Sequence, residues 1–162
     1  MPFYGVTTTK QIEDIVISVV GVLGGGSKAI RLMLGTCAAE TNFGEAEDTH
    51  ALSGYGLFQL DKIAIQDLKE RTREHHRVAI EDRFGIYLDD IKPRDLNHSP
   101  LLAAICCRLH YKLVPDPIPA DIEGRAKYWK KHYNKNGKGT PEHYIKRCGQ
   151  LYGSDLYNAL CD

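Results

Sequence analysis

Apolar residues at helical spacing recur along most of this chain, and this periodicity limits the folds that it can adopt. Residues 12–23 carry one such pattern, and residues 30–38 carry another that ends at Glu40. A spacing of three and four residues places apolar side chains on one face of an α-helix. The period-two alternation that is typical of strands is confined to residues 86–88. The sequence therefore predicts a mainly α protein.

Capping residues and helix breakers divide this pattern into separate helices. Thr9 is expected to cap the first helix, three glycines at 24–26 to end it, and Ser27 to cap the second. Prolines 115, 117 and 119 predict an extended segment that no helix can enter. A short hairpin is expected within residues 42–58. Later helices are predicted from Asp61 to about His75, over 78–90, from Ser99-Pro100 over 101–113, from Asp121 to Tyr133, and from Thr140-Pro141 onward.

Length and charge restrict the class of protein further. A chain of 162 residues fits one domain, 1–162, with residues 1–8 and 154–162 expected to be loosely ordered ends. Twenty-one basic and twenty-one acidic residues cancel, which argues against nucleic acid as a partner. Residues 125–138 nevertheless hold six Lys or Arg and no acid. This basic strip is interpreted either as a solvated helix face or as a ligand-facing patch.

Cysteine usage and hydropathy bear on the compartment. The five cysteines include the adjacent pair Cys106-Cys107 in an apolar run, which favours small buried hydrophobes over a disulfide framework and indicates synthesis in a reducing compartment. No standard signal peptide is visible, and residues 12–23 are too short to span a bilayer. The seven histidines form no His-Glu-x-x-His motif, so we expect no metal and no cofactor.

Glu40 is the residue that most directly suggests chemistry. It follows Cys37, Ala38 and Ala39, and Gln59 stands nineteen positions later in the glycine-framed segment 56–60. A carboxyl that burial keeps neutral can act as a general acid, for example toward a sugar oxygen. The sequence therefore favours glycoside cleavage over the alternative, a solvated acid at a helix end.

Three segments together resemble a known family. Residues 39–44 (Ala-Glu-Thr-Asn-Phe-Gly), residues 53–60 (Ser-Gly-Tyr-Gly-Leu-Phe-Gln-Leu) and residues 133–137 (Tyr-Asn-Lys-Asn-Gly) are similar, in order and spacing, to three successive motifs of the soluble lytic transglycosylase and goose-type lysozyme superfamily. The resemblance covers roughly residues 27–152 and implies a lysozyme-like fold. The segment 130–145 also resembles bacteriophage lysozymes, either endolysins or virion-associated cell-wall hydrolases.

The resemblance implies a role for particular residues. Glu40 would be the general acid at the β-1,4 bond between N-acetylmuramic acid and N-acetylglucosamine in peptidoglycan. Gln59 would bind the sugar N-acetyl group, or alternatively satisfy the loop backbone. Tyr133 and Asn134 would lie across from Glu40, the hydroxyl close to the acid and the amide orienting the sugar, although Tyr133 could equally be a core aromatic. Further substrate-binding candidates are Ser53, Tyr55, Phe58 and Tyr111. Arg108 is expected to turn toward the cleft together with Tyr111. Trp129 is interpreted as a core residue.

The chain departs from the family pattern at three positions. Thr41 replaces the usual Ser after the catalytic acid, and Phe58 replaces the frequent Met. His50 occupies the place of a Ser nine residues before Gln59, which leaves the N-acetyl contact open.

The mechanism depends on a second carboxylate. An inverting hydrolase needs one roughly 6.5 to 9.5 Å from the acid, and a retaining hydrolase needs one at roughly 5 to 5.5 Å. The candidates are Glu45, Glu47, Asp48 and Asp61. A lytic transglycosylase needs none, because the muramyl 6-hydroxyl attacks its own anomeric carbon. Lytic transglycosylase is therefore slightly favoured over hydrolytic muramidase.

The resemblance also implies partners and a place of action. The substrate would be peptidoglycan, with no membrane insertion. The protein would be made in the host cytoplasm without a signal peptide, and would act in the periplasm, at the cell wall or within a phage virion. The alternative is a non-catalytic, lysozyme-fold structural component of a phage particle, in contact with other phage structural or tail proteins.

Overall fold

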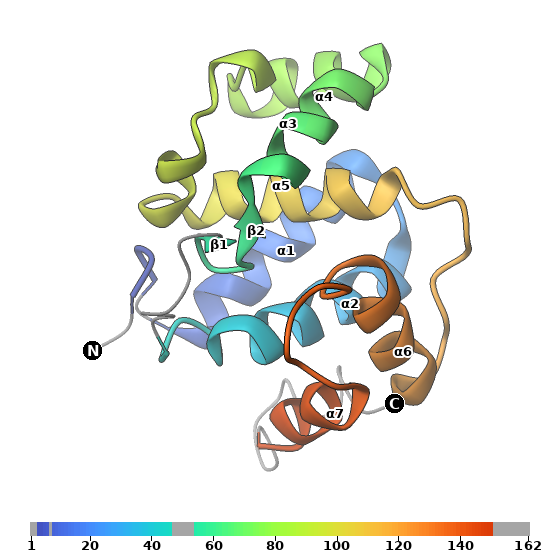
Figure 1. Ribbon diagram of the computed structural model, residues 1–162. Helices are drawn as coiled ribbons and strands as arrows, with labels where there is room; N and C mark the ends of the chain where they lie inside the picture. Colours follow the sequence, from blue (N-terminus) through green and yellow to red (C-terminus); the bar gives the residue numbers. More distant parts are fainter. Residues whose placement is uncertain (1–2, 7, 47–53, 151–162) are drawn as a thin grey trace.

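The computed structural model describes residues 3–6, 8–46 and 54–150, and the predicted mainly α fold with a small hairpin is confirmed (Figure 1). The described part holds seven α-helices, two 3-10 helices and one two-stranded antiparallel sheet. None of its helices is long and apolar enough to cross a membrane. In the first segment, expected to be loosely ordered, the Phe3 N–H donates to the Gly44 carbonyl at 2.7 Å and Val6 is buried.

The first two helices begin one residue away from the predicted caps. Helix α1 (Thr9–Leu23) is capped by Thr8, whose hydroxyl accepts from the Gln11 N–H at 3.1 Å, so Thr9 is already helical. Helix α2 (Gly26–Thr41) has no side-chain cap, and Ser27 lies inside its first turn. Gly25 precedes it at φ 118°, a left-handed conformation that favours glycine.

The helices in the middle of the chain end earlier than predicted. Asp61 caps helix α3 (Lys62–Arg71) as expected, accepting from the Ala64 N–H at 2.7 Å. Thr72 is extended, however, so the helix stops before His75 and α4 (Glu74–Phe84) starts separately. Gly85 at φ 66° ends α4. The 3-10 helix η1 (Leu88–Asp90) therefore replaces the end of the helix predicted over 78–90, and a second 3-10 helix, η2 (Pro93–Asn97), follows it.

The last three helices agree with their capping signals. Ser99 caps α5 (Pro100–Lys112), Asp121 caps α6 (Ile122–His132) and Thr140 caps α7 (Pro141–Gly149). The segment with the three prolines connects α5 to α6 without a helix. Ser, Thr and Asp at the N-cap accept from N–H groups that the helix itself cannot satisfy, which explains why these starts could be predicted.

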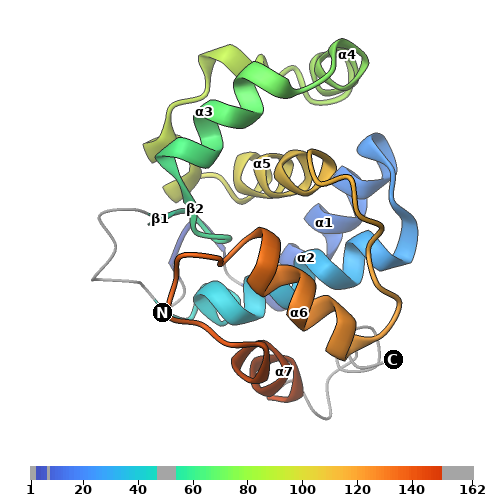
Figure 2. The same ribbon diagram turned by 45° about the vertical axis from the view of Figure 1, so that its right-hand side comes forward.

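Helix α2 occupies the centre of the molecule (Figures 1 and 2). It contacts α1 and α5 on one side and α6 and α7 on the other, and nearly all of its side chains from Leu32 to Ala39 are buried. Helix α5 packs across α1, with α3 and η2 beside it. The described cysteines are buried, as predicted: Cys37, Cys106, Cys107 and Cys148.

The hairpin lies slightly later than predicted. Strand β1 (Gly54–Tyr55) pairs antiparallel with β2 (Leu60–Asp61), in the register Gly54 with Asp61 and Tyr55 with Leu60. Its second strand therefore lies beyond residue 58. The Gly56 N–H donates to the Asn97 side-chain oxygen at 2.8 Å, which attaches the hairpin to η2.

Candidate functional site

Glu40 lies half-buried in the last turn of α2 and is held by two residues from the other end of the chain. Its Oε1 accepts from the Trp129 indole N–H at 3.2 Å and from the Asn134 side-chain amide at 3.1 Å. Ala38 and Ala39, which precede it, are buried. Burial also raises the pKa of the neighbouring Cys37 thiol, so this thiol stays neutral and is not a thiolate nucleophile.

Both of these hydrogen bonds end on the same carboxyl oxygen of Glu40. An oxygen that faces two N–H donors acts as an acceptor, so a proton on this carboxyl resides on Oε2. The two donors also fix the plane of the carboxyl. The arrangement can therefore present a carboxylic acid whose proton-carrying oxygen has a defined direction, which general acid catalysis requires.

The loop after α6 is wrapped around a single ammonium group. Lys130 Nζ donates to the Asn134 backbone oxygen at 2.9 Å, to Asn134 Oδ1 at 3.3 Å and to the Gly137 carbonyl at 2.8 Å. A Cβ on Gly137 would stand 2.5 Å from Asn134 Oδ1, and one on Gly139 would stand 2.5 Å from the Trp129 ring. The loop thus packs directly on the two residues that hold Glu40.

The ammonium of Lys130 determines which way the Asn134 amide points. Oδ1 faces the cation, so the NH₂ group faces the carboxyl of Glu40. The reverse orientation would oppose the NH₂ group to the ammonium and the amide oxygen to the carboxylate, two repulsive contacts. The amide was expected to orient a sugar; in the structure it holds the acid.

Tyr133 connects the third segment to the second. Its hydroxyl donates to the Phe58 carbonyl at 2.7 Å, and its ring stacks on Tyr111 with centroids 5.0 Å apart. Burial raises the pKa of Tyr133 well above its usual value, and the neighbouring Cys107, Tyr111 and Glu40 add to this effect. The phenol therefore stays protonated, and its hydroxyl hydrogen bond is made with the loop carbonyl.

Thr41 connects the first segment to the second. Its hydroxyl donates to the Leu57 carbonyl at 2.8 Å and accepts from the Gly44 N–H at 3.1 Å. A serine hydroxyl could make the same two bonds, so the Thr at this position keeps the function of the hydroxyl. The three segments identified from sequence therefore meet at one place.

Gln59 has one satisfied and one unsatisfied end. Its side-chain NH₂ donates to the Gly56 carbonyl at 2.9 Å and to the Tyr4 hydroxyl at 3.2 Å, which agrees with the loop-stabilising alternative. Its Oε1 is buried and has no hydrogen-bond partner among the described residues. A buried acceptor without a partner is costly, and this oxygen packs against Gly54, where an added Cβ would collide with it.

Several candidate side chains lie in the interior instead of at a surface. The Phe58 side chain is buried, and Tyr111 is 2% exposed with its hydroxyl 2.8 Å from Thr36 Oγ1. Arg108 donates from Nε to the Gly24 carbonyl at 2.9 Å, at the far end of α2 from Glu40. Tyr111 and Arg108 therefore do not turn toward Glu40 as expected. Ser53 and His50 lie outside the described residues.

The candidate second carboxylates have other surroundings. Asp61 accepts from the Ala64 N–H as the cap of α3, and Glu45 is exposed after the end of α2. Glu47 and Asp48 lie outside the described residues. Within the described ranges, no group of three or more His, Cys, Asp or Glu could hold a metal ion.

The basic strip 125–138 does not form one surface. Arg125 is buried and donates to the Ala120 carbonyl, and Lys130 is enclosed by its own loop. Lys131 lies 3.9 Å from Asp116. Only part of the strip faces solvent, so neither a uniform helix face nor a continuous ligand-facing patch describes it.

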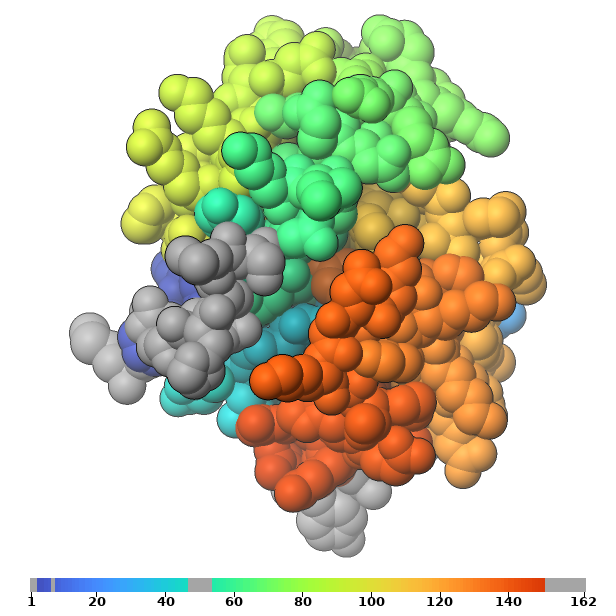
Figure 3. Space-filling view, viewed as in Figure 1, coloured from blue at the N-terminus to red at the C-terminus, as the bar shows by residue number. Residues whose placement is uncertain are grey.

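The surface near Glu40 is hollowed. Figure 3 shows a depression between residues 54–71, in green, and residues 130–140, in orange, with part of α2, in cyan, at its floor. Glu40 lies in the last turn of α2 and the orange segment contains Asn134, so the depression is formed by the elements that carry the three segments.

Two residues of the site were missed from sequence. Trp129 was interpreted as core, and it is buried, but its indole N–H also binds Glu40. Lys130 was assigned only to the basic strip. A signal existed, since Trp129 precedes Tyr133 and Lys130 precedes Asn134 by four positions at a helix end, which places each pair on one face.

Comparisons with known proteins do not identify a relative. No protein-family model matches the chain, and neither the curated proteins nor the solved structures include a significant match.

Proposed function

We propose that this protein cleaves the glycan strands of peptidoglycan at the β-1,4 bond between N-acetylmuramic acid and N-acetylglucosamine, with Glu40 as general acid and base. The observation that carries the proposal is the carboxyl of Glu40, oriented by Trp129 and Asn134 through Oε1. It lies where the three segments that resemble the lytic transglycosylase and goose-type lysozyme superfamily come together.

The proposed reaction uses a single carboxyl twice. Glu40 Oε2 gives its proton to the bridging oxygen, and the glycosidic bond breaks as positive charge develops at the anomeric carbon. The resulting carboxylate then takes the proton of the muramyl 6-hydroxyl, whose oxygen bonds to that carbon. The product is a 1,6-anhydro sugar, and Glu40 is protonated again for the next turnover.

The positions of the two candidate acids within the described residues favour lytic transglycosylase over hydrolytic muramidase. Asp61 is engaged as a helix cap, and Glu45 is exposed beyond the end of α2. A hydrolase needs a second carboxylate at a defined separation from the acid, whereas the anhydro product needs none. By the same resemblance, Gln59 would bind the sugar N-acetyl group.

Digestion of purified peptidoglycan tests the proposal. The wild type should release muropeptides with 1,6-anhydro ends, identified by mass spectrometry, and Glu40→Gln should release at least about 10³-fold less because the amide has no proton to give. Reducing ends would favour the hydrolase. Equal inactivity of wild type and variant would favour the structural component of a phage particle, with its lysozyme fold kept and its chemistry absent.

A further inference from the structure

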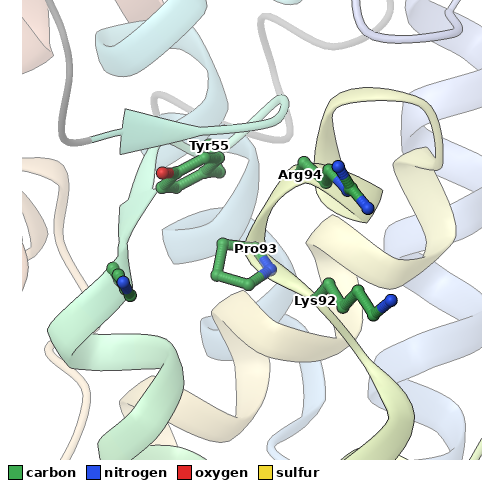
Figure 4. Close-up of a pocket in the computed structure, with 5 residues that line it drawn as sticks. Tyr55, Lys92, Pro93 and Arg94 are labelled. Atoms are coloured by element: carbon green, nitrogen blue, oxygen red, sulfur yellow. The ribbon is translucent and has the colours of Figure 1, made fainter.

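Tyr55, a predicted substrate-binding residue, lines a hollow of about 320 Å³ together with Lys62, Lys92, Pro93 and Arg94. Figure 4 shows the Tyr55 ring and Pro93 on its two sides, whereas Lys92 and Arg94 extend away from the space between them. These two cations therefore direct no charge into the hollow. The polar contact that bears on Glu40 lies elsewhere, at the end of α2.

The Ala39 carbonyl is left open where α2 ends. The N–H groups of Asn42 and Phe43 donate to the carbonyls of Ala38 and Cys37, at 3.0 and 3.4 Å. Both residues have positive φ, 48° and 56°, so the chain leaves the helix at this point. Among the described residues, no backbone N–H donates to the Ala39 oxygen. A carbonyl in the last turn of a helix needs a partner from outside the helix.

His143 of α7 supplies this partner. Its Nε2 lies 2.9 Å from the Ala39 oxygen, and because a carbonyl only accepts, Nε2 carries the hydrogen. The His143 ring also lies beside the Trp129 ring, with centroids 6.5 Å apart. One side chain therefore binds the backbone just before Glu40 and lies against the indole that holds the Glu40 carboxyl.

The backbone bond acts directly on Glu40. The Ala39 carbonyl and the Glu40 N–H belong to one planar peptide unit, so a donor that fixes the oxygen also limits the movement of the Glu40 backbone. The base of His143 is fixed as well. Its backbone N–H donates to the capping hydroxyl of Thr140 at 3.1 Å, and the next residue, Tyr144, is buried with its ring centroid 5.6 Å from that of Trp129.

We propose that His143 is a positioning residue for Glu40. It touches no reacting atom, and it acts through the Ala39 peptide and the Trp129 ring. The inference rests on the proposed function, because it assigns a further residue to the same reaction. Helix α7 then contributes to catalysis by holding the end of α2 in place.

Two substitutions at His143 test this role. His143→Leu removes the N–H donor, and we expect kcat to fall by about tenfold with little change in KM, since a small misplacement of the acid slows the reaction. His143→Gln keeps an N–H donor near the place of Nε2 and should restore most of kcat. Thr140→Ala is the matched control, because it removes the cap of α7 and leaves the imidazole in place. It should lower the urea midpoint and leave kcat per folded molecule unchanged.

NMR gives a readout that does not depend on activity. Trp129 is the only tryptophan, so one indole N–H resonance reports on the bond to Glu40. Both His143 variants lack the imidazole ring, so a difference between their indole resonances reports the bond to Ala39 and not the lost ring. The imidazole ¹⁵N shifts of the wild type should show a hydrogen on Nε2.

Three results would overturn the inference: a neutral imidazole with its hydrogen on Nδ1, the same kcat and indole resonance in His143→Leu and His143→Gln, or a loss of kcat that Thr140→Ala shares. Failure of the proposed function would appear differently, as absence of muropeptides from the wild-type digest. The imidazole and indole resonances would then still decide whether His143 holds the end of α2.

Discussion

Replacing Lys130 by Met tests whether one ammonium group organises the site. The change keeps the aliphatic stem but removes the three donated bonds to Asn134 O, Asn134 Oδ1 and the Gly137 carbonyl. A hydrogen bond to a charged group contributes roughly 1.5–3 kcal/mol when its surroundings exclude water. Here one bond is exposed and water can replace the ammonium, so we expect the free energy of unfolding to fall by only about 1–2 kcal/mol.

The effect on catalysis should be larger than the effect on stability. Without the ammonium, nothing prevents the Asn134 amide from rotating and turning its oxygen toward Glu40, which would misplace the carboxyl. Misplacement of about 1 Å can cost around 10²-fold in rate, so we expect kcat to fall by about 10- to 100-fold with little change in KM. A purely structural role would lower the folded fraction alone and leave kcat per folded molecule unchanged.

Three measurements separate these effects. Urea unfolding, followed by Trp129 fluorescence, gives the stability, and release of muropeptides gives kcat and KM. The side-chain amide resonances of Asn134 report its orientation directly. Lys127→Met, an exposed lysine one turn earlier on α6, is the matched control. If Lys130→Met and Lys127→Met behave alike in rate and in the Asn134 resonances, the reasoning about the amide is refuted.

Three other predictions concern the same cluster. Trp129→Phe removes the indole N–H from Glu40 but keeps a ring in the core, and chemical denaturation should show a loss of about 1–3 kcal/mol in stability, including the smaller packed volume. A loss in turnover as small as that of a control at a partly buried ring away from Glu40, Phe84→Leu, would argue against the hydrogen bond. Gly137→Ala should reduce turnover by about tenfold, a loss of roughly 1.4 kcal/mol in transition-state stabilisation, because the new methyl would stand 2.5 Å from Asn134 Oδ1. Gly149→Ala, whose Cβ would meet nothing within 4 Å, should be silent, and equal rates for both variants would contradict the close packing of the loop. Burial raises the pKa of Tyr133 and of Tyr111 well above the usual value and that of Cys106 to about 12, so the folded state keeps protons that the unfolded state loses at lower pH. These groups contribute their full stability below about pH 8, and that contribution falls as pH rises through about 9 to 12. Urea midpoints measured against pH should show this fall, and phenolate absorbance should show that both tyrosines ionise late. Ionisation of both tyrosines at their ordinary pKa in the folded protein would contradict their burial.

Local signals in the sequence were sufficient to predict where most of the helices begin. Asp61, Ser99, Asp121 and Thr140 each cap the helix predicted for them, because an N-cap interaction spans only three residues and needs no distant partner. Where the prediction was wrong, competing local conformations decided the outcome. Thr72 adopts an extended conformation between two stretches that both favour a helix, and glycine at 25 replaces a side-chain cap.

The sequence by itself determined a mainly α chain with an acid at the end of its central helix, since periodicity and caps act over a few residues. The tertiary structure alone decided what that acid touches. Trp129 and Asn134 are 89 and 94 positions from Glu40, and they reach it only because α6 packs against α2. The burial of Tyr111 and the position of Gln59 Oε1, without a partner among the described residues, likewise depend on packing between distant segments. Such contacts depend on how whole helices pack, and no pattern within a short stretch of sequence carries that information.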